Sequence, residues 1–228
     1  MKKLLAFVAI VGGLVAAYLY AYPIYNFRYR VTVEVEVDGN VRSGESVVEV
    51  RWVTWPPFIP LDVSRDYSID LHGEAVFVDL GPTHLPLILT LSTSAAEDGC
   101  RTCASFGYLP LRVYEVMQGR EGLSTLGQKM KSRAEVNRAY WPGFITFENR
   151  LEPTSVRFVH PRRLDEVLGP GIRLRAVTIE ATDAPVTQRL GENLPWVRKP
   201  LKDGFVGHLE GAAARSLYVR DLIAPDPP

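Results

Sequence analysis

The feature that most constrains the fold is a strict alternation of apolar and polar residues shortly after the amino terminus. In the stretch YRVTVEVEV the alternating apolar residues are Val31, Val33, Val35 and Val37. A period of two places these valines on one face of a β-strand and the intervening threonine and glutamates on the other. The sequence DGN then suits a tight turn, and SVVEVRWV returns with Val48, Val50 and Trp52 in alternation. We therefore predict an antiparallel hairpin with one buried face and with cross-strand Glu–Arg pairs on the wet face.

Short strands separated by turns continue along the body of the chain. We expect them at residues 74–80, 85–91, 143–149, 154–160, 172–182 and 216–223. Regular structure breaks at WPPFIP, residues 55–60, because its three prolines remove backbone hydrogen-bond donors. The absence of a βαβ rhythm and of an internal sequence repeat argues against a parallel doubly wound sheet and against a solenoid.

Helical patterns are few in the body. Residues 122–140 have the spacing of an amphipathic helix, since apolar residues recur there at intervals of three and four. The clearest of them are Leu123, Leu126 and Met130. A short helix is expected at residues 161–169, which begin with proline and end with glycine. The predicted fold class is α+β: sheet-dominated, with mainly antiparallel strands, one longer amphipathic helix and short helices.

The amino terminus carries the longest apolar run. Residues 4–25 contain no charged side chain, and Lys2 and Lys3 precede them. A helix of this length can cross a hydrocarbon core of roughly 30 Å, whereas the apolar region of a signal peptide is usually about 7 to 15 residues long. We interpret the run as an uncleaved signal anchor. The alternatives are a signal peptide cleaved near the weak site VAA at residues 15–17 and a buried core helix.

The charges that flank this run favour one orientation. The two lysines and the amino terminus slightly outweigh Arg28 and Arg30 on the far side, so we expect a cytoplasmic amino terminus and an exported body. In a bacterium this is a single-pass protein of the cytoplasmic membrane with a periplasmic domain, or a secreted protein if the signal is cleaved. The expected division is an anchor at 1–26, one globular domain at 27–223 and a disordered tail at 224–228.

Several strand and turn segments resemble a family of uncharacterised exported or membrane-attached proteobacterial proteins. The segments are YRVTVEVEVDGNVRSGESVVEVRW, FITFEN, LDEVLGPGIRLRAVTIEATDAPVT and LPWV, behind the short apolar amino-terminal segment. The resemblance covers most of the body, except for residues 95–140. It implies an envelope location and one compact domain, and it carries no activity, cofactor or catalytic residue.

The two cysteines, Cys100 and Cys103, lie in the sequence GCRTCASFG. In an oxidising compartment the first expectation for this spacing is a structural disulfide in a loop. Free thiols, a redox pair and half of a zinc site are the alternatives. A thioredoxin-like pair needs a helix that starts at the motif, and zinc needs further ligands that no second CxxC or paired histidines supply.

Motifs of common enzymes are missing from the sequence, which contains no GxSxG, SxxK, HExxH, Walker A or GxGxxG pattern. Any of the four histidines could act as a general base, but isolated histidines are more often surface or capping residues. They are His72, His84, His160 and His208. We expect no cofactor and no metal.

Charge and aromatic residues suggest only weak binding hypotheses. The chain has 26 basic and 26 acidic residues, so no net charge attracts nucleic acid. Five arginines could form a patch for an anionic partner such as a lipid headgroup or a polysaccharide, although nearby acids could equally balance them on wet surfaces. They are Arg157, Arg162, Arg163, Arg173 and Arg175. Trp52, Trp55 and Trp196 could line a groove or cover the open end of a sheet.

The sequence thus predicts a membrane-anchored protein of the cell envelope, held by residues 4–25. We expect a non-catalytic binding or structural module that acts on an envelope protein or polysaccharide. A periplasmic hydrolase whose site is built from scattered residues is the alternative, and a thiol redox factor built on Cys100 and Cys103 is a third hypothesis.

Overall fold

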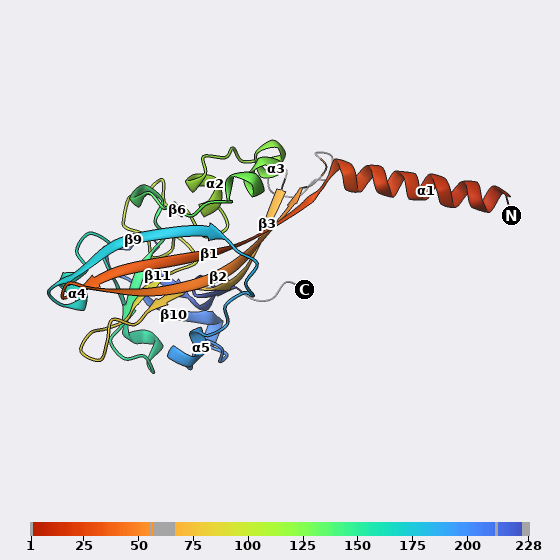
Figure 1. Cartoon of the computed structure of the whole chain (residues 1–228). Coiled ribbons are helices and arrows are strands. Elements are labelled where there is room, and N and C mark those ends of the chain that lie inside the picture. Colours follow the sequence, from red (N-terminus) through yellow and green to blue (C-terminus); the bar gives the residue numbers. More distant parts are fainter. Residues whose placement is uncertain (1, 55, 57–66, 213, 225–228) are drawn as a thin grey trace.

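A single long helix projects from one end of an elongated body (Figure 1). The computed structural model describes residues 2–54, 56, 67–212 and 214–224. Helix α1 (Lys2–Ala21) buries none of its residues, and by length and composition it could cross a membrane. At a rise of 1.5 Å per residue it is about 30 Å long, the thickness of a hydrocarbon core. Apolar side chains around the whole helix therefore lack any cover from the body.

The predicted hairpin forms the centre of a six-stranded antiparallel sheet. The sheet has the strand order β12-β3-β2-β1-β9-β6. Its members are β1 (Ile24–Val37), β2 (Asn40–Thr54), β3 (Tyr67–Glu74), β6 (Ala134–Glu135), β9 (Ile172–Ala181) and β12 (Ile223–Ala224). Strands β1 and β2 pair along their full length, and the turn between them has positive φ at Asp38 and Gly39. The alternating valines face the core, so the predicted hairpin and its buried face are confirmed.

A second, four-stranded antiparallel sheet packs against the buried face of the first. It consists of β4 (Val76–Val78), β5 (Leu87–Leu89), β7 (Phe144–Phe147) and β8 (Val156–Phe158). Both faces of β5 and β7 are buried, which explains why every residue of these strands is apolar except Thr146, whose hydroxyl donates to the carbonyl oxygen of Pro86. Gly44 permits the close approach of the two sheets, since a Cβ there would lie 2.1 Å from the carbonyl oxygen of Phe77. The main core lies between these sheets.

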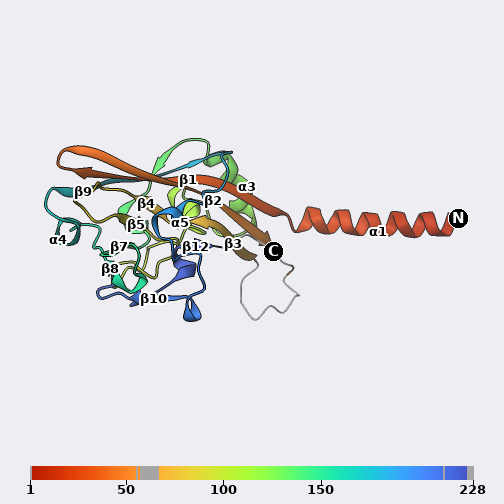
Figure 2. The ribbon, with the colours of Figure 1, turned by 90° about the horizontal axis from the view of Figure 1, so that it is seen from below.

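The carboxyl-terminal part of the chain, which we call the carboxyl-terminal layer, packs on the other side of β7 from the main core, and Figure 2 shows its strand β10 (Phe205–His208) below β8. It contains α5 (Leu190–Asn193), the hairpin of β10 and β11 (Ser216–Tyr218), and the 3-10 turns η3 (Lys202–Gly204) and η4 (Val219–Asp221). Ile145 and Phe147 of β7 contact this layer, and Phe144 contacts the main core. The predicted α+β, sheet-dominated and mainly antiparallel fold is confirmed.

The predicted helix at residues 122–140 is wrong in its second half. Helix α3 (Arg120–Lys129) ends where Met130 closes the last turn, and the chain then pairs with the edge of β9 as β6. The amide of Val136 also donates to the carbonyl oxygen of Val177 at 2.8 Å. An exposed strand edge offers unpaired backbone groups, and pairing with it outweighs the weak helical pattern here. A 3-10 turn, η1 (Arg138–Tyr140), follows.

Two further boundaries differ from prediction because side chains bind nearby backbone groups. Residues 160–163 form a turn, since Nδ1 of His160 accepts a hydrogen bond from the amide of Arg162, and the helix α4 (Asp165–Leu168) is only four residues long. Gly169 ends it with a positive φ, as predicted. The predicted strand at 216–223 is interrupted by η4, because Asp221 accepts from the amide of Tyr218. The two remaining short elements are α2 (Leu109–Val113) and η2 (Pro153–Ser155).

The predicted domain limits also shift. Strand β1 starts at Ile24, so the expected boundary at residue 26 falls inside the sheet. Ala224 belongs to β12, and the rest of the predicted tail, 225–228, lies outside the described residues. Of the proline-rich segment 55–60, only the buried Pro56 is described, so Trp55 also lies outside the described residues.

Candidate functional site

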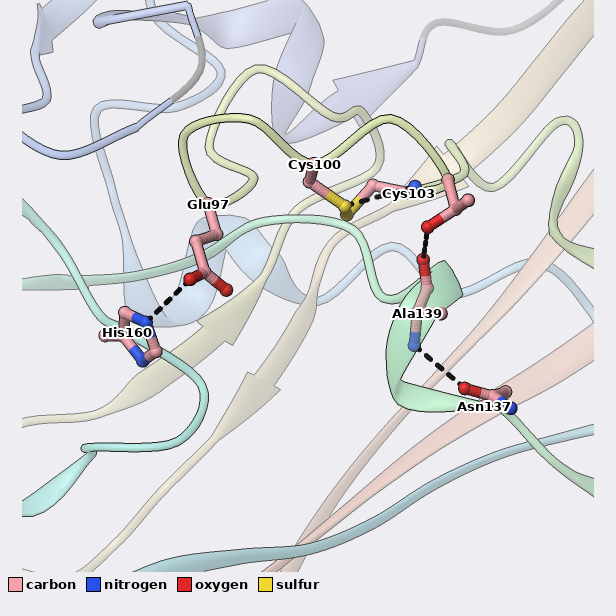
Figure 3. Close-up of a disulfide and its surroundings, with 7 residues drawn as sticks. Glu97, Cys100, Cys103, Asn137, Ala139 and His160 are labelled. Carbon is pink, nitrogen blue, oxygen red and sulfur yellow. Dashed lines mark hydrogen bonds and ion pairs between the residues drawn. A yellow bond between two sulfur atoms is a disulfide. The ribbon is translucent and has the colours of Figure 1, made fainter.

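The predicted loop disulfide joins Cys100 and Cys103 (Figure 3). The loop is fastened on one side by the Thr102 hydroxyl, which donates to the carbonyl oxygen of Ala139 at 2.7 Å. On the other side Glu97 forms a β-bridge with Ala212. No helix begins in this fully described loop, so it lacks the helix terminus that lowers a thiol pKa in redox proteins. The bond therefore closes a short ring within the loop, and Thr102 and Glu97 attach the loop to its neighbours.

His160 links the disulfide loop to the turn before α4. Its Nε2 lies 3.0 Å from Oε1 of Glu97, and its Nδ1 accepts from the amide of Arg162 at 3.1 Å. Because Nδ1 is an acceptor, the hydrogen-bond network assigns the proton to Nε2, which donates to the glutamate. Both ring nitrogens are thus engaged. His160 holds two segments together and has no free nitrogen for general-base chemistry.

The other histidines have different surroundings. Nδ1 of His84 lies 3.3 Å from the carbonyl oxygen of Leu168, and Nδ1 of His208 lies 3.4 Å from the hydroxyl of Ser216. Neither these two nor His160 lines the crevices described below. His72 lines one of them. Among the described residues, no group of three or more His, Cys, Asp or Glu side chains could hold a metal ion.

The five arginines that could have formed an anion-binding patch are distributed over two sheets and a turn. Three have carboxylate partners: Arg157 with Glu148 at 2.9 Å, Arg163 with Glu166 at 3.1 Å and Arg175 with Glu34 at 3.8 Å. Arg162 is exposed in the turn before α4, and Arg173 is exposed on β9. Their placement fits arginines balanced by acids on wet surfaces better than one concentrated patch.

The described tryptophans are packing residues. Trp52 is buried between Tyr67 and Tyr108, with ring centroids 5.1 and 5.6 Å away. Trp196 packs edge-on against Phe147 and donates from its indole nitrogen to a backbone carbonyl. The two rings belong to different core clusters, so they do not share a groove.

The wet face of the six-stranded sheet carries the predicted cross-strand ion pairs. Arg28 contacts Glu49 at 2.5 Å, and Arg30 lies 3.5 Å from Glu45 and 3.4 Å from Glu180. On the opposite, buried face of the sheet, burial raises the pKa of Tyr29 well above its ordinary value. The Tyr29 hydroxyl donates to the carbonyl oxygen of Phe106 at 2.5 Å.

Residues 182–189, which we call the crossing segment, pass over this charged face from the end of β9 toward α5. The amide of Thr182 donates to the carbonyl oxygen of Arg28. Further on, Thr187 pairs with the edge of β2: its amide donates to the carbonyl oxygen of Val47 at 3.0 Å, and its hydroxyl accepts from the amide of Val47 at 2.9 Å. The segment therefore buries Val47 on an otherwise wet face.

Of the crevices along the crossing segment, two share Glu74. The larger, of about 390 Å³, is lined by Arg30 and Glu45 and by the apolar side chains of Phe77 and Leu190. The smaller, of about 290 Å³, is lined by residues that include His72, Val197 and Arg198. We take the larger crevice as the candidate site, because it combines charged groups, amides and an aromatic ring in a hollow of ligand-like size.

Glu74 lines both crevices and is only 2% exposed. One carboxylate oxygen accepts from Arg198, and the other accepts from the amide of Leu190 at 2.8 Å. Its carbonyl oxygen accepts from the hydroxyl of Ser46 at 2.7 Å. Since both carboxylate oxygens are occupied, Glu74 has a structural role and is not poised as a base.

One polar group in the larger crevice has an unused hydrogen-bond donor. The Nε of Arg30 is buried and has no hydrogen-bond partner among the described residues, although Glu45 lies near enough for an ion pair. Neither crevice is lined by a described serine or cysteine. The arrangement can bind a polar ligand, and the hydroxyl of Thr187 and the carboxylate of Glu45 are among the groups that line the larger crevice.

Sequence reasoning missed Glu74, its partner Arg198 and a second buried acid, Asp221. The carboxylate of Asp221 accepts from the hydroxyls of Ser92 and Ser94 at 2.6 and 2.9 Å. An acid beside an apolar run, as in EAVFV, is the only signal for Glu74 in the sequence, and it does not reveal partners more than 100 residues away.

Comparison with family models, curated proteins and solved structures gave no match. The resemblance to exported proteobacterial proteins therefore stays an expectation from the sequence.

Proposed function

We propose that this chain is a membrane-anchored protein of the cell envelope whose body is a non-catalytic binding module on the periplasmic side. The observation that carries the proposal is the fully exposed apolar helix α1 joined directly to the central strand of the body. In water the large apolar side chains of α1 would stay exposed to solvent, whereas a bilayer of matching thickness would bury them. The body, with its charged surfaces, would then stay outside the membrane.

The disulfide supports an oxidising compartment for the body. Disulfides persist in the periplasm and outside the cell and are rare in the cytosol. With Lys2 and Lys3 at the other end of α1, a cytoplasmic amino terminus and a periplasmic body are consistent with the charge rule.

Export and anchoring have separate tests. Alkaline phosphatase fused to the carboxyl terminus should be active if the body is periplasmic, and a fusion active only in the cytosol would contradict the proposed orientation. Carbonate extraction should leave the full-length chain in the membrane. Release of a chain that mass spectrometry shows to lack residues 1–17 would instead identify a cleaved signal peptide.

We place the binding site in the larger crevice beside the crossing segment. The Nε of Arg30, which has no hydrogen-bond partner among the described residues and lies 3.5 Å from Glu45, offers a donor, the carboxylate of Glu45 offers an acceptor, and Phe77 offers an apolar surface. This mixture suits a polar, uncharged chain such as a polysaccharide or an extended peptide segment.

In-cell photocrosslinking tests this placement. p-Benzoylphenylalanine in place of Gln188, which lines the crevice, should give one defined adduct, and Arg30→Gln should remove it. The same probe in place of Leu151 is the matched control, because Leu151 is exposed and does not line the crevice. Replacing both cysteines by alanine should leave the adduct intact. An adduct that persists in Arg30→Gln would move the binding site elsewhere.

A further inference from the structure

The loop 115–119 and helix α3 lie at the end of the body next to α1, and a series of hydrogen bonds connects them to it. Only Tyr22 and Pro23 separate α1 from β1, and the hydroxyl of Thr54 donates to the carbonyl oxygen of Pro23 at 2.9 Å. Tyr67 lies opposite Thr54 in the sheet, and its hydroxyl lies 3.0 Å from the side-chain oxygen of Gln118. The loop 115–119 and helix α3 are therefore at this end, as Figures 1 and 2 both show for α3.

Exposed apolar side chains are found at this end. Outside α1, the described residues include four exposed large hydrophobic side chains: Ile24, Val41, Met117 and Leu151. Ile24 begins β1, and Met117 neighbours Gln118 in the loop, with 76% of its surface exposed. Val41 stands at the hairpin tip, at the opposite end of β1. An apolar side chain this exposed is unfavourable in water and favourable in a lipid interface.

A hollow adjoins Met117. It has a volume of about 470 Å³ and is lined by residues of the loop and of α3, which include Val116 and Lys129 and also the acidic Glu115 and Glu121. The hollow lies on the same loop as the exposed methionine, so an inserted chain end or headgroup would find room beside it.

Basic residues are concentrated in the same segment. Residues 112–133 contain five arginines or lysines and two glutamates, although the whole chain is balanced at 26 of each sign. Lys129 and Lys131 are both exposed. Clusters of exposed lysine and arginine next to a membrane-spanning helix attract anionic phospholipids.

From these observations we infer that the loop 115–119 and α3 dock on the anionic headgroup layer of the same bilayer that holds α1, with Met117 inserted among the acyl chains. The inference rests on the proposed function, since it requires α1 to span that bilayer. The body then makes a second, direct contact with the membrane.

Photocrosslinking to lipid in nanodiscs tests the docking on the full chain. p-Benzoylphenylalanine replaces Met117, Leu151 or Leu14 in separate variants, and mass spectrometry scores lipid adducts in discs with and without phosphatidylglycerol. Leu151 is the matched control because it is 71% exposed and lies in the turn between β7 and β8. Leu14 reports the anchor. We expect adducts at Leu14 and Met117 and none at Leu151.

Each outcome has one meaning. An adduct at Leu14 without one at Met117 would overturn the docking and leave the anchor intact, whereas no adduct at Leu14 would overturn the anchor. Equal adducts at Met117 and Leu151 would show unspecific contact and also overturn the docking. The double variant Lys129→Glu with Lys131→Glu should lower the Met117 yield about tenfold in anionic discs. An unchanged yield would contradict headgroup recognition.

Discussion

Replacing Glu74 by glutamine should loosen the join between the six-stranded sheet and the carboxyl-terminal layer. The carboxylate is almost completely buried, and it binds Arg198 and the amide of Leu190, both from the chain beyond the crossing segment. Glutamine keeps the size of the side chain and one acceptor for the amide. Its NH₂ group then faces Arg198 and cannot accept from the guanidinium.

The magnitude depends on which partner is left behind. Arg198 is 48% exposed, so after Glu74→Gln its charge returns to water and the loss is limited to about 2 kcal/mol of unfolding free energy. Arg198→Gln instead leaves the Glu74 charge buried without its cation, which costs roughly 3 kcal/mol or more. The double variant should cost about as much as Glu74→Gln alone, because the second change removes nothing that is still paired.

Urea unfolding of the full chain in detergent micelles, followed by tryptophan fluorescence, measures these differences by linear extrapolation. The control is Glu148→Gln, whose partner Arg157 lies 2.9 Å away on an exposed surface; it should cost about 0.5 kcal/mol or less. If Glu74→Gln and Glu148→Gln had equal effects, or if Arg198→Gln were the milder change, the assigned role of burial would be refuted.

Three further perturbations test other parts of the fold. Replacing Cys100 and Cys103 by serine opens a ring closed over a sequence separation of 3 and should cost about 2 kcal/mol, as measured by urea unfolding with and without reductant. Gly44→Ala places a methyl group against the carbonyl of Phe77, which should reduce the free energy of unfolding by about 1–3 kcal/mol and lower the melting temperature. An unchanged melting temperature would show that the two sheets can move apart there without cost. Burial raises the pKa of Tyr29, so only the unfolded chain ionises this group above pH 10.0. The free energy of unfolding should therefore fall as the pH rises through that range. Thermal melts at alkaline pH should show a smaller fall for Tyr29→Phe.

The parts of the fold that sequence predicts best are those whose signal is local. The hairpin could be predicted because each valine position, the turn residues and the return strand all lie within about 25 consecutive residues and obey one period. The disulfide was predictable for a similar reason, since the two cysteines are neighbours and their context is loop-like. Helix α1 is evident from length and charge alone.

The missed features depend on partners far apart in the chain. Residues 134–135 form a strand only because the edge of β9 is available to them, and β9 lies about 40 residues later. Glu74 is buried against Arg198, which follows it by 124 residues in the sequence. The crossing segment is positioned by hydrogen bonds to Val47, which precedes Thr187 by 140 residues. No periodicity records such pairings, so the candidate site could not be derived from the sequence.

The short connection between α1 and β1 limits what the binding module can reach. With only two residues between them, and with Pro23 itself hydrogen-bonded to Thr54, the sheet cannot swing freely about its anchor. At about 3.3 Å per residue, the hairpin tip would stand roughly 45 Å from the membrane end of β1, and Arg30 in the crevice only about 20 Å from it. A ligand for the crevice must therefore come within about 20 Å of the bilayer. This distance favours a partner that lies on the membrane surface or is attached to it. A second membrane contact through Met117 would keep the crevice at this distance from the bilayer.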